Sequence, residues 1–102
     1  MKLNLIVEAF NVGKLPKQGC ISIYGNFFGK PGDTISSIKE ISIDNNSLVF
    51  RLGDSKILSI ESPEEISYDS NSIVISKSTS VKVDNEEYLP VGGKEALNLY
   101  NW

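Results

Sequence analysis

The 102-residue chain contains no histidine, only one cysteine and no long hydrophobic run. Without histidine, neither a Ser–His nor a Cys–His nucleophile pair can form, and the usual general base near neutral pH is missing. Zinc and similar metals favour histidine and cysteine ligands. We therefore expect no metal site and no cofactor. The one thiol, Cys20, cannot form an internal disulfide and has no base beside it in the sequence, so we interpret it as structural.

Hydrophobic patterning and charge limit the partners of the chain. Residues 1–8 include Glu8 and lack the long apolar run of a signal peptide, and no stretch approaches the ~20 apolar residues of a membrane span. Residues 40–102 hold five basic against eleven acidic residues, whereas residues 1–39 hold five lysines against two acids. Nucleic-acid binding depends on concentrated lysine and arginine. We expect a cytoplasmic protein that binds neither membranes nor nucleic acids.

From Cys20 onward, hydrophobic residues alternate with polar ones in short β-branched runs. Turn-forming Asp, Asn, Ser and Gly residues separate these runs, which is typical of an antiparallel sheet or small barrel. Residues 1–102 are predicted to form a single mainly-β domain, an antiparallel meander sheet or small open barrel. Short connections should make neighbouring strands antiparallel. The predicted core is Ile21, Ile23, Ile41, Ile43, Leu48, Phe50, Leu52, Leu58, Ile60, Ile66, Tyr68, Ile73, Ile75, Val81 and Val83.

The two ends of the chain carry their own patterns. Leu3, Ile6, Val7 and Phe10 match the apolar stripe of a helix, although residues 3–9 also match a strand. Gly13 is a candidate C-terminal stop and favours a short helix.

Residues 96–102 alternate again and predict a last strand. Leu97 and Leu99 should lie on one face, and Tyr100 and Trp102 on the other. We expect both aromatic side chains to pack.

Residues 24–33 combine three aromatics, three glycines and a proline. Gly29-Lys30 resembles a phosphate loop, but the spacing is one residue short and Pro31 replaces the metal-binding hydroxyl. Residues 30–33 instead predict a type II turn, with proline second and glycine third. Phe27 and Phe28 should face opposite ways if the segment is extended. Both can pack in the core, or one can join a partner-binding patch. The candidate binding residues are Tyr24, Asn26, Phe27, Phe28, Lys30, Asp33 and Tyr88.

Residues 88–94 repeat this combination of an aromatic, a proline, glycines and a lysine. Whether the two loops lie at the same end of the sheet is left open by the sequence.

Acidic and amide residues form three further groups. Residues 44–47 begin like a calcium loop but lack the sixth-position glycine and the twelfth-position glutamate, so we interpret them as a hairpin turn. The doublets Glu64-Glu65 and Glu86-Glu87 point to opposite faces of a strand, so neither forms a converging acid pair. Carboxylates from different strands can still meet.

Two loops and a hairpin resemble a family of short uncharacterised bacterial proteins. The first motif is aromatic-Phe-Gly-basic-Pro-x-Asp, present as residues 27–33. The second is a Tyr/Gly/basic loop at residues 88–94, followed by Asn98-Leu99-Tyr100, and the hairpin of residues 48–60 with Pro63 also fits. Relatives tend to carry tryptophan at the position of Phe27, arginine at that of Lys30, and Asp-Asn-x-His where this chain has residues 33–36. The likeness covers roughly residues 19–101 and implies no activity.

The absence of catalytic residues and the presence of two glycine- and aromatic-rich loops favour a non-catalytic, cytoplasmic protein-interaction module. An immunity or antitoxin-like role fits by analogy with other small acidic proteins. The alternative is small-molecule or carbohydrate binding through Tyr24, Phe27, Tyr88 and Trp102. A third hypothesis is a hydrolase that uses carboxylates from different strands.

Overall fold

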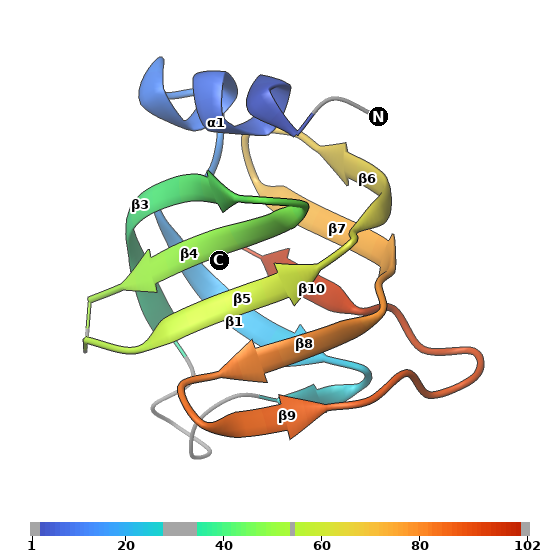
Figure 1. Cartoon of the computed structure of the whole chain (residues 1–102). Helices are drawn as coiled ribbons and strands as arrows, with labels where there is room; N and C mark the ends of the chain where they lie inside the picture. The colour runs from blue at the N-terminus through green and yellow to red at the C-terminus, as the bar shows by residue number, and fades with distance from the viewer. Residues whose placement is uncertain (1–2, 28–34, 54, 101–102) are drawn as a thin grey trace.

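A computed structural model describes residues 3–27, 35–53 and 55–100, which form one helix and one antiparallel sheet of ten strands (Figure 1). The prediction of a mainly-β protein with a short N-terminal helix is confirmed. The elements are α1 (Asn4–Asn11), β1 (Gln18–Ile23), β2 (Asn26–Phe27), β3 (Ile35–Asp44), β4 (Ser47–Leu52), β5 (Ile57–Glu61), β6 (Glu64–Tyr68), β7 (Ser72–Lys77), β8 (Ser80–Val83), β9 (Glu86–Tyr88) and β10 (Leu97–Tyr100).

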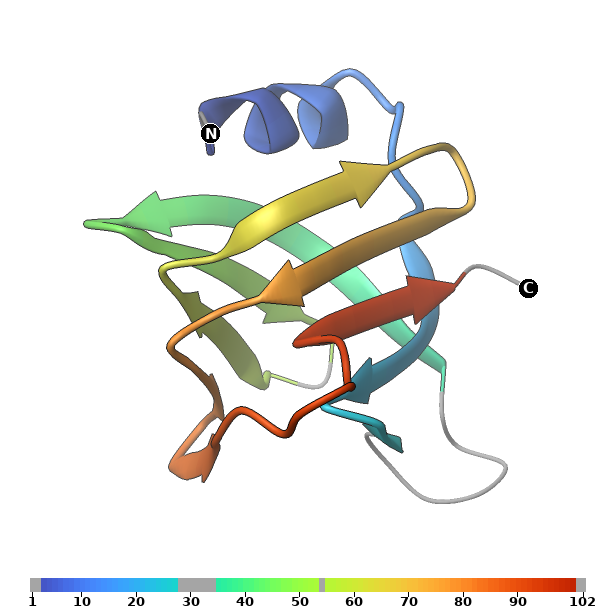
Figure 2. The same cartoon turned by 90° about the vertical axis from the view of Figure 1, so that its right-hand side faces the viewer.

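The strands pair in the order β6-β7-β10-β1-β3-β4-β5-β8-β9, and β2 pairs with β1 beside this path. The sheet curls into two layers, with β3, β4 and β5 opposite β1, β10 and β7 (Figures 1 and 2). β3 belongs to both layers, because its first residues pair with β1 and its later residues pair with β4. Within the described residues, β6 and β9 are the open ends of the sheet.

β5 to β8 form a single long hairpin that is bent in the middle. β5 runs into β6 through Ser62-Pro63, and β7 runs into β8 through Ser78-Thr79. Because β5 pairs with β8 and β6 pairs with β7, the two halves of the hairpin belong to different layers. All paired strands are antiparallel, as predicted, but β5 does not pair with β6, nor β7 with β8. Ser62 has a φ of 50°, which redirects the strand without reversing it.

Helix α1 lies across the top of the curled sheet in Figure 1. Ile6, Ala9 and Phe10 are buried against the core, so the helical interpretation of this segment is confirmed and the strand alternative is wrong. The helix ends at Asn11, and Gly13, whose φ is 79°, follows the C-cap residue Val12. The N–H of Gly13 donates to the carbonyl of Phe10 at 3.1 Å and that of Lys14 donates to Ala9 at 2.8 Å. These two bonds are the Schellman motif, which requires a residue that tolerates positive φ.

Most of the predicted core is buried, with two corrections. Ile43 and Tyr68 are 40% and 42% exposed. Ile43 lies in the part of β3 that pairs with β4 but not with β1, so no strand covers it on one side. Tyr68 is the last residue of the edge strand β6 and also lacks a neighbouring strand on one side. Leu97 and Leu99 share a buried face as predicted, but Tyr100 is 48% exposed and does not pack as expected. Trp102 lies outside the described residues.

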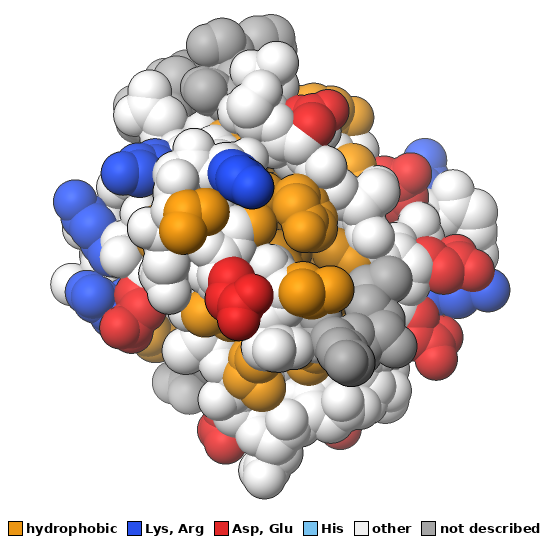
Figure 3. Space-filling model, turned by 90° about the horizontal axis from the view of Figure 1, so that it is seen from above, with side chains coloured by type: hydrophobic (Ala, Val, Ile, Leu, Met, Phe, Trp, Pro, Cys, Tyr) orange, Lys and Arg blue, Asp and Glu red, His pale blue; other side chains and the backbone are white. Residues whose placement is uncertain are grey.

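The outer face of α1 is partly apolar. Leu5 and Val12 are 51% and 66% exposed. Figure 3, a view from above, shows hydrophobic side chains in the middle of this face, with acidic and basic side chains among them as well as at its margins. No helix in the described part of the chain is long and apolar enough to cross a membrane.

Candidate functional site

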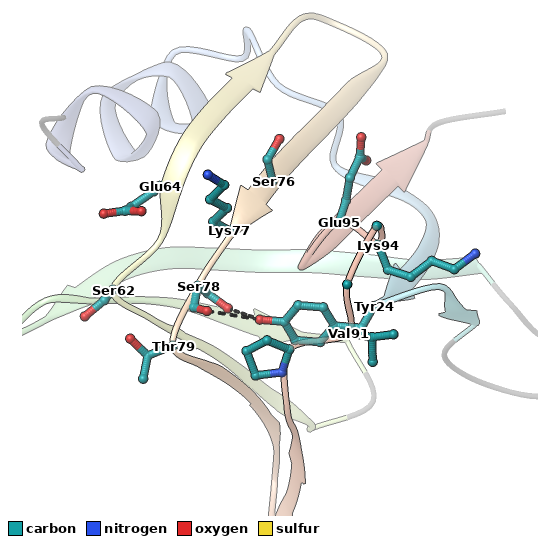
Figure 4. Close-up of a pocket in the computed structure, with 13 residues that line it drawn as sticks. Tyr24, Ser62, Glu64, Ser76, Lys77, Ser78, Thr79, Val91, Lys94 and Glu95 are labelled. Atoms are coloured by element: carbon teal, nitrogen blue, oxygen red, sulfur yellow. Dashed lines mark hydrogen bonds between the residues drawn. The ribbon is translucent and has the colours of Figure 1, made fainter.

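The bend of the long hairpin and the loop of residues 89–95 (the 89–95 loop) border a cleft of about 620 Å³ (Figure 4). Residues from four segments meet there: the two breaks of the bent hairpin, the turn after β1, and the 89–95 loop. The lining residues are Tyr24, Ser62, Glu64, Ser76, Lys77, Ser78, Thr79, Pro90, Val91, Gly92, Gly93, Lys94 and Glu95.

Tyr24 forms part of the wall of the cleft from a strained position. Ile23 pairs with Asn26, so Tyr24-Gly25 is a two-residue hairpin turn. Its φ values of 46° and 82° are both positive, as a type I′ turn requires. Positive φ costs a side-chain-bearing residue about 1–2 kcal/mol. Burial offsets this cost, because Tyr24 is only 4% exposed.

The hydroxyl of Tyr24 also bonds across the cleft to the second break of the hairpin. Tyr24 Oη donates to the carbonyl of Ser78 at 3.3 Å and contacts the Ser78 hydroxyl at hydrogen-bond distance (Figure 4). The two residues are 54 positions apart in the chain. The bond therefore connects the β1–β2 turn to the second break of the hairpin, between β7 and β8.

The 89–95 loop rests directly on the same turn. The N–H of Tyr24 donates to the carbonyl of Glu95 at 3.0 Å. A Cβ added to Gly25 would lie 3.0 Å from Cδ of Lys94, so the Lys94 stem covers this glycine. The loop turns through a bond of 3.1 Å from the N–H of Lys94 to the carbonyl of Val91, with Gly93 at a φ of 79°. The β1–β2 turn and the second glycine-rich loop thus lie together, which the sequence left open.

The first break of the hairpin is held by the turn between β3 and β4. The hairpin interpretation of residues 44–47 is confirmed, since Asp44 pairs with Ser47. Within this turn, the carbonyl of Asn46 accepts the N–H of Ser62 at 2.9 Å. Asn46 Nδ2 donates to the Ser62 hydroxyl at 3.0 Å. Ser62 can therefore keep its positive φ and remain at the edge of the cleft.

Charges of both signs border the cleft, and two of the four charged side chains bond to a neighbouring residue. Lys77 Nζ lies 3.8 Å from a carboxylate oxygen of Glu65. Glu95 Oε2 accepts Nδ2 of Asn98 at 3.1 Å. Lys94 extends away from the Tyr24 ring in Figure 4. Glu64 has no ion pair with another residue in the described ranges, and its carboxylate is exposed.

The sequence-predicted site residues are distributed unevenly around this cleft. Tyr24 lines it, but as a buried wall and not as an exposed ring. Asn26 begins β2 and is exposed, and Phe27 pairs its backbone with Ser22. Phe28, Lys30 and Asp33, together with the predicted type II turn, lie outside the described residues.

Tyr88 lies on β9 and packs partly against the core instead of lining the cleft. Its hydroxyl donates to Glu86 Oε2 at 3.1 Å. Burial raises the pKa of Tyr88 above its ordinary value of 10.0, and the hydrogen bond to Glu86 and its negative charge add to this rise.

Sequence reasoning missed the hydroxyl groups of Ser62, Ser76, Ser78 and Thr79. In the sequence these serines fall among the turn-forming residues that separate predicted strands. The serine- and threonine-rich composition of residues 76–80 was the one available signal, and composition of this kind does not separate a lined cleft from an ordinary loop.

The carboxylates at the cleft are open to solvent. Glu64 and Glu95 both line it, from different elements, but both residues are exposed to solvent. No group of three potential metal ligands occurs among the residues that the structure places. Cys20 is 3% exposed and does not line the cleft.

Comparisons with family models, with curated proteins and with solved structures find no match for this chain.

Proposed function

We propose that the protein is a non-catalytic, cytoplasmic interaction module that binds another protein at the cleft and along the 89–95 loop. The observation that carries this proposal is a continuous exposed apolar segment at the rim of the cleft. Leu89 is 63% exposed, Val91 is 48% exposed, and Pro90 between them is also exposed. Pro90 and Val91 are themselves part of the cleft lining.

The energetics favour an interface for this segment. Leaving a large aliphatic side chain in water forgoes about 1.5–3 kcal/mol of burial. Isolated exposed apolar residues are ordinary, whereas a contiguous group beside a hollow is typical of a binding surface. The loop is also anchored, through the bonds from Tyr24 to Glu95 and from Lys94 to Val91, so it is presented in a defined shape. A preorganised loop loses less conformational entropy when it binds.

The test is affinity capture from an extract of the native cells, followed by quantitative mass spectrometry. The variant Leu89→Ser/Val91→Ser removes both exposed aliphatic side chains from the loop. We expect the captured partner to fall by about tenfold or more, as loss of an interface hot spot does.

The matched control is Leu5→Ser/Val12→Ser, which makes the same two substitutions at exposed positions of α1. Both variants should keep the wild-type circular dichroism spectrum. Capture that is unchanged by the loop variant, or lost equally in the α1 variant, would refute the proposal.

A second candidate function, binding of a small polar molecule, is favoured by the size of the cleft. About 620 Å³ lies within the range of ligand pockets, and four serine and threonine side chains line it. Because Tyr24 is 4% exposed, its ring cannot be a stacking platform for a sugar. Titration with sugars and nucleotides, followed by NMR of backbone amides, should give saturable shifts at residues 76–79 if this candidate is right and none there if it is not.

A further inference from the structure

The free edge of β9 continues directly into the exposed segment of the 89–95 loop. β9 lies at the bottom of the sheet in Figure 1 and pairs with β8 alone among the described strands. The chain leaves it at Leu89, whose side chain is 63% exposed, and reaches the cleft at Pro90 and Val91. An unpaired strand edge beside exposed apolar residues is a template for pairing with another chain.

One hydrogen bond determines which residues of β8 face β9. The N–H of Asp84 donates to the carbonyl of Ile57 on β5 at 2.9 Å, so the backbone of Asp84 faces β5. Successive residues of a strand direct their N–H and C=O groups to opposite sides. The backbone groups of Val83 and Val81 therefore face β9, and those of Lys82 face β5.

Glu87 is consequently the residue of β9 whose backbone groups do not bond to β8. The two valines pair with Glu86 and Tyr88, which therefore use their backbone groups on β8. Glu87 lies opposite Lys82 and directs its N–H and C=O away from β8. In an extended chain the next residue with this orientation is Leu89. The free backbone edge and the exposed apolar segment thus coincide.

The other open end of the sheet is less suited to pairing. In β6, Glu65 has a φ of 55°, and a positive φ interrupts the extended backbone that an added strand must follow. None of the three residues of β9, all of them described, has a positive φ. The side chain of Glu87 stands on a face of the sheet and leaves the edge uncovered.

We propose that the partner adds an extended segment to the free edge of β9, hydrogen-bonded to the N–H and C=O of Glu87, and that apolar side chains of this segment contact Leu89 and Val91. This inference rests on the proposed function and specifies how the partner is recognised. Main-chain bonds give such strand addition its affinity, and side chains beside the edge give it specificity. The partner segment should therefore be rich in β-branched residues and free of proline.

The probes are the peptide acetyl-Thr-Val-Thr-Val-Thr-amide and the same peptide with the backbone nitrogen of every residue methylated. Methylation keeps the side chains and removes the N–H donors that a strand needs. Binding to the full chain is followed by NMR of backbone amides. We expect the unmethylated peptide to shift Glu87 and Leu89, to slow hydrogen exchange at the Glu87 amide, and to bind at least about tenfold more tightly than the methylated peptide.

Two variants of one residue separate the backbone from the side chain. Glu87→Pro removes the outward N–H and none of the bonds from β9 to β8, and it should weaken binding of the unmethylated peptide by about tenfold. Glu87→Gln keeps the N–H and removes the charge, so it should change the affinity by less than about twofold. Circular dichroism checks the fold of both variants, and the comparison of the two peptides on the wild-type chain needs neither variant.

Equal binding of the two peptides, no saturable binding of either, or equal losses in Glu87→Pro and Glu87→Gln would overturn the inference. The two proposals fail separately. A chain that loses its captured partner in Leu89→Ser/Val91→Ser but keeps it in Glu87→Pro retains the proposed function and loses strand addition. A chain that keeps the partner in both variants loses the proposed function itself.

Discussion

Two hairpin turns of this protein each begin with a residue at positive φ, but the residue type at that position differs. Asn45-Asn46 joins β3 to β4, and Tyr24-Gly25 joins β1 to β2. The first residue of each has a positive φ, 56° for Asn45 and 46° for Tyr24. Asparagine adopts this conformation readily, whereas a bulky aromatic does so rarely. Asn45 is exposed and Tyr24 is 4% exposed.

The difference shows whether local sequence or tertiary contacts determine the conformation of each turn. The Asn45-Asn46 turn follows from its local sequence, since its residues favour turns by themselves. The Tyr24-Gly25 turn is held by tertiary contacts: burial of the ring, the bonds to Ser78 and the bond to Glu95. Those same contacts form the wall of the cleft. Strain at a buried residue therefore coincides with the candidate site, as it often does at functional positions.

Among substitutions in these two turns, Tyr24→Ala should cause the largest loss of stability. Removing a buried aromatic ring creates a cavity and should lower the free energy of unfolding by about 3–5 kcal/mol. Urea denaturation monitored by circular dichroism measures this. A loss below about 1 kcal/mol would show that the ring contributes little packing and that the turn is locally determined after all.

Tyr24→Phe isolates the hydroxyl of the same residue. The ring stays buried, but the bonds to Ser78 are lost, and we expect a loss of about 1–2 kcal/mol in the free energy of unfolding. The matched control is Tyr68→Phe, whose ring is 42% exposed. That control should change stability by less than about 0.5 kcal/mol. Equal effects of the two substitutions would remove the Tyr24–Ser78 bond as a cause of the turn's conformation.

Gly25→Ala tests the second residue of the strained turn. The φ of 82° penalises any side chain, and the new Cβ would press on the Lys94 stem. We expect a loss of about 1–2 kcal/mol and altered amide resonances in the 89–95 loop. Gly92→Ala is the control, because it lacks a positive φ and has no neighbour within 4 Å of the added Cβ. A loop that is unaffected by Gly25→Ala would show that it does not depend on this turn.

Asn45→Gly tests the locally determined turn. Both residues tolerate positive φ, and Asn45 is exposed, so the free energy of unfolding should change by less than about 0.5 kcal/mol. Thermal denaturation is sufficient to measure this. A loss as large as that of Gly25→Ala would mean that the side chain of Asn45 carries a tertiary role, and the contrast between the two turns would disappear.

The sequence predicted the features that depend on short-range patterns. The strands follow from alternation of β-branched residues, the helix from the stripe of Ile6 and Phe10, and its end from Gly13. The turn at residues 44–47 follows from its asparagines. Each of these depends on residues within a few positions of one another, which is why the pattern is visible in the sequence.

The cleft could not be predicted in this way. β10 inserts between β7 and β1, and no local pattern specifies that pairing. The breaks at Ser62 and Ser78 resemble chain reversals in the sequence, and only the pairing of β5 with β8 shows that they are bends. Tyr24 is buried because the 89–95 loop covers its turn from about 70 residues away, a distance at which alternation carries no information.

A third turn, at residues 69–72, is another example of a turn fixed by its local sequence. Substitution in it gives the smallest predicted change in stability. Asp69 Oδ1 accepts the N–H of Asn71 at 2.7 Å and that of Ser72 at 2.9 Å, so this turn is fixed by its own side chain. The N–H of Asn71, followed by the N–H and hydroxyl of Ser72, holds the pKa of Asp69 below its ordinary value of 3.8 against the opposing effect of desolvation. Because the folded pKa is the lower one, the bonds stabilise the fold above the unfolded pKa, and this contribution is lost as pH falls through the folded pKa.

The melting temperature of the wild type should therefore exceed that of Asp69→Ala at neutral pH, and the gap should narrow as the pH is lowered below 3.8. A carbon NMR titration of the Asp69 carboxyl gives the folded midpoint directly. A midpoint at or above 3.8, or a gap that widens in acid, would show that the charged side chain does not hold this turn. The Tyr24-Gly25 turn, which has no carboxylate, should show no such narrowing between wild type and Tyr24→Phe over the same range, because its hydrogen bonds involve neutral groups alone.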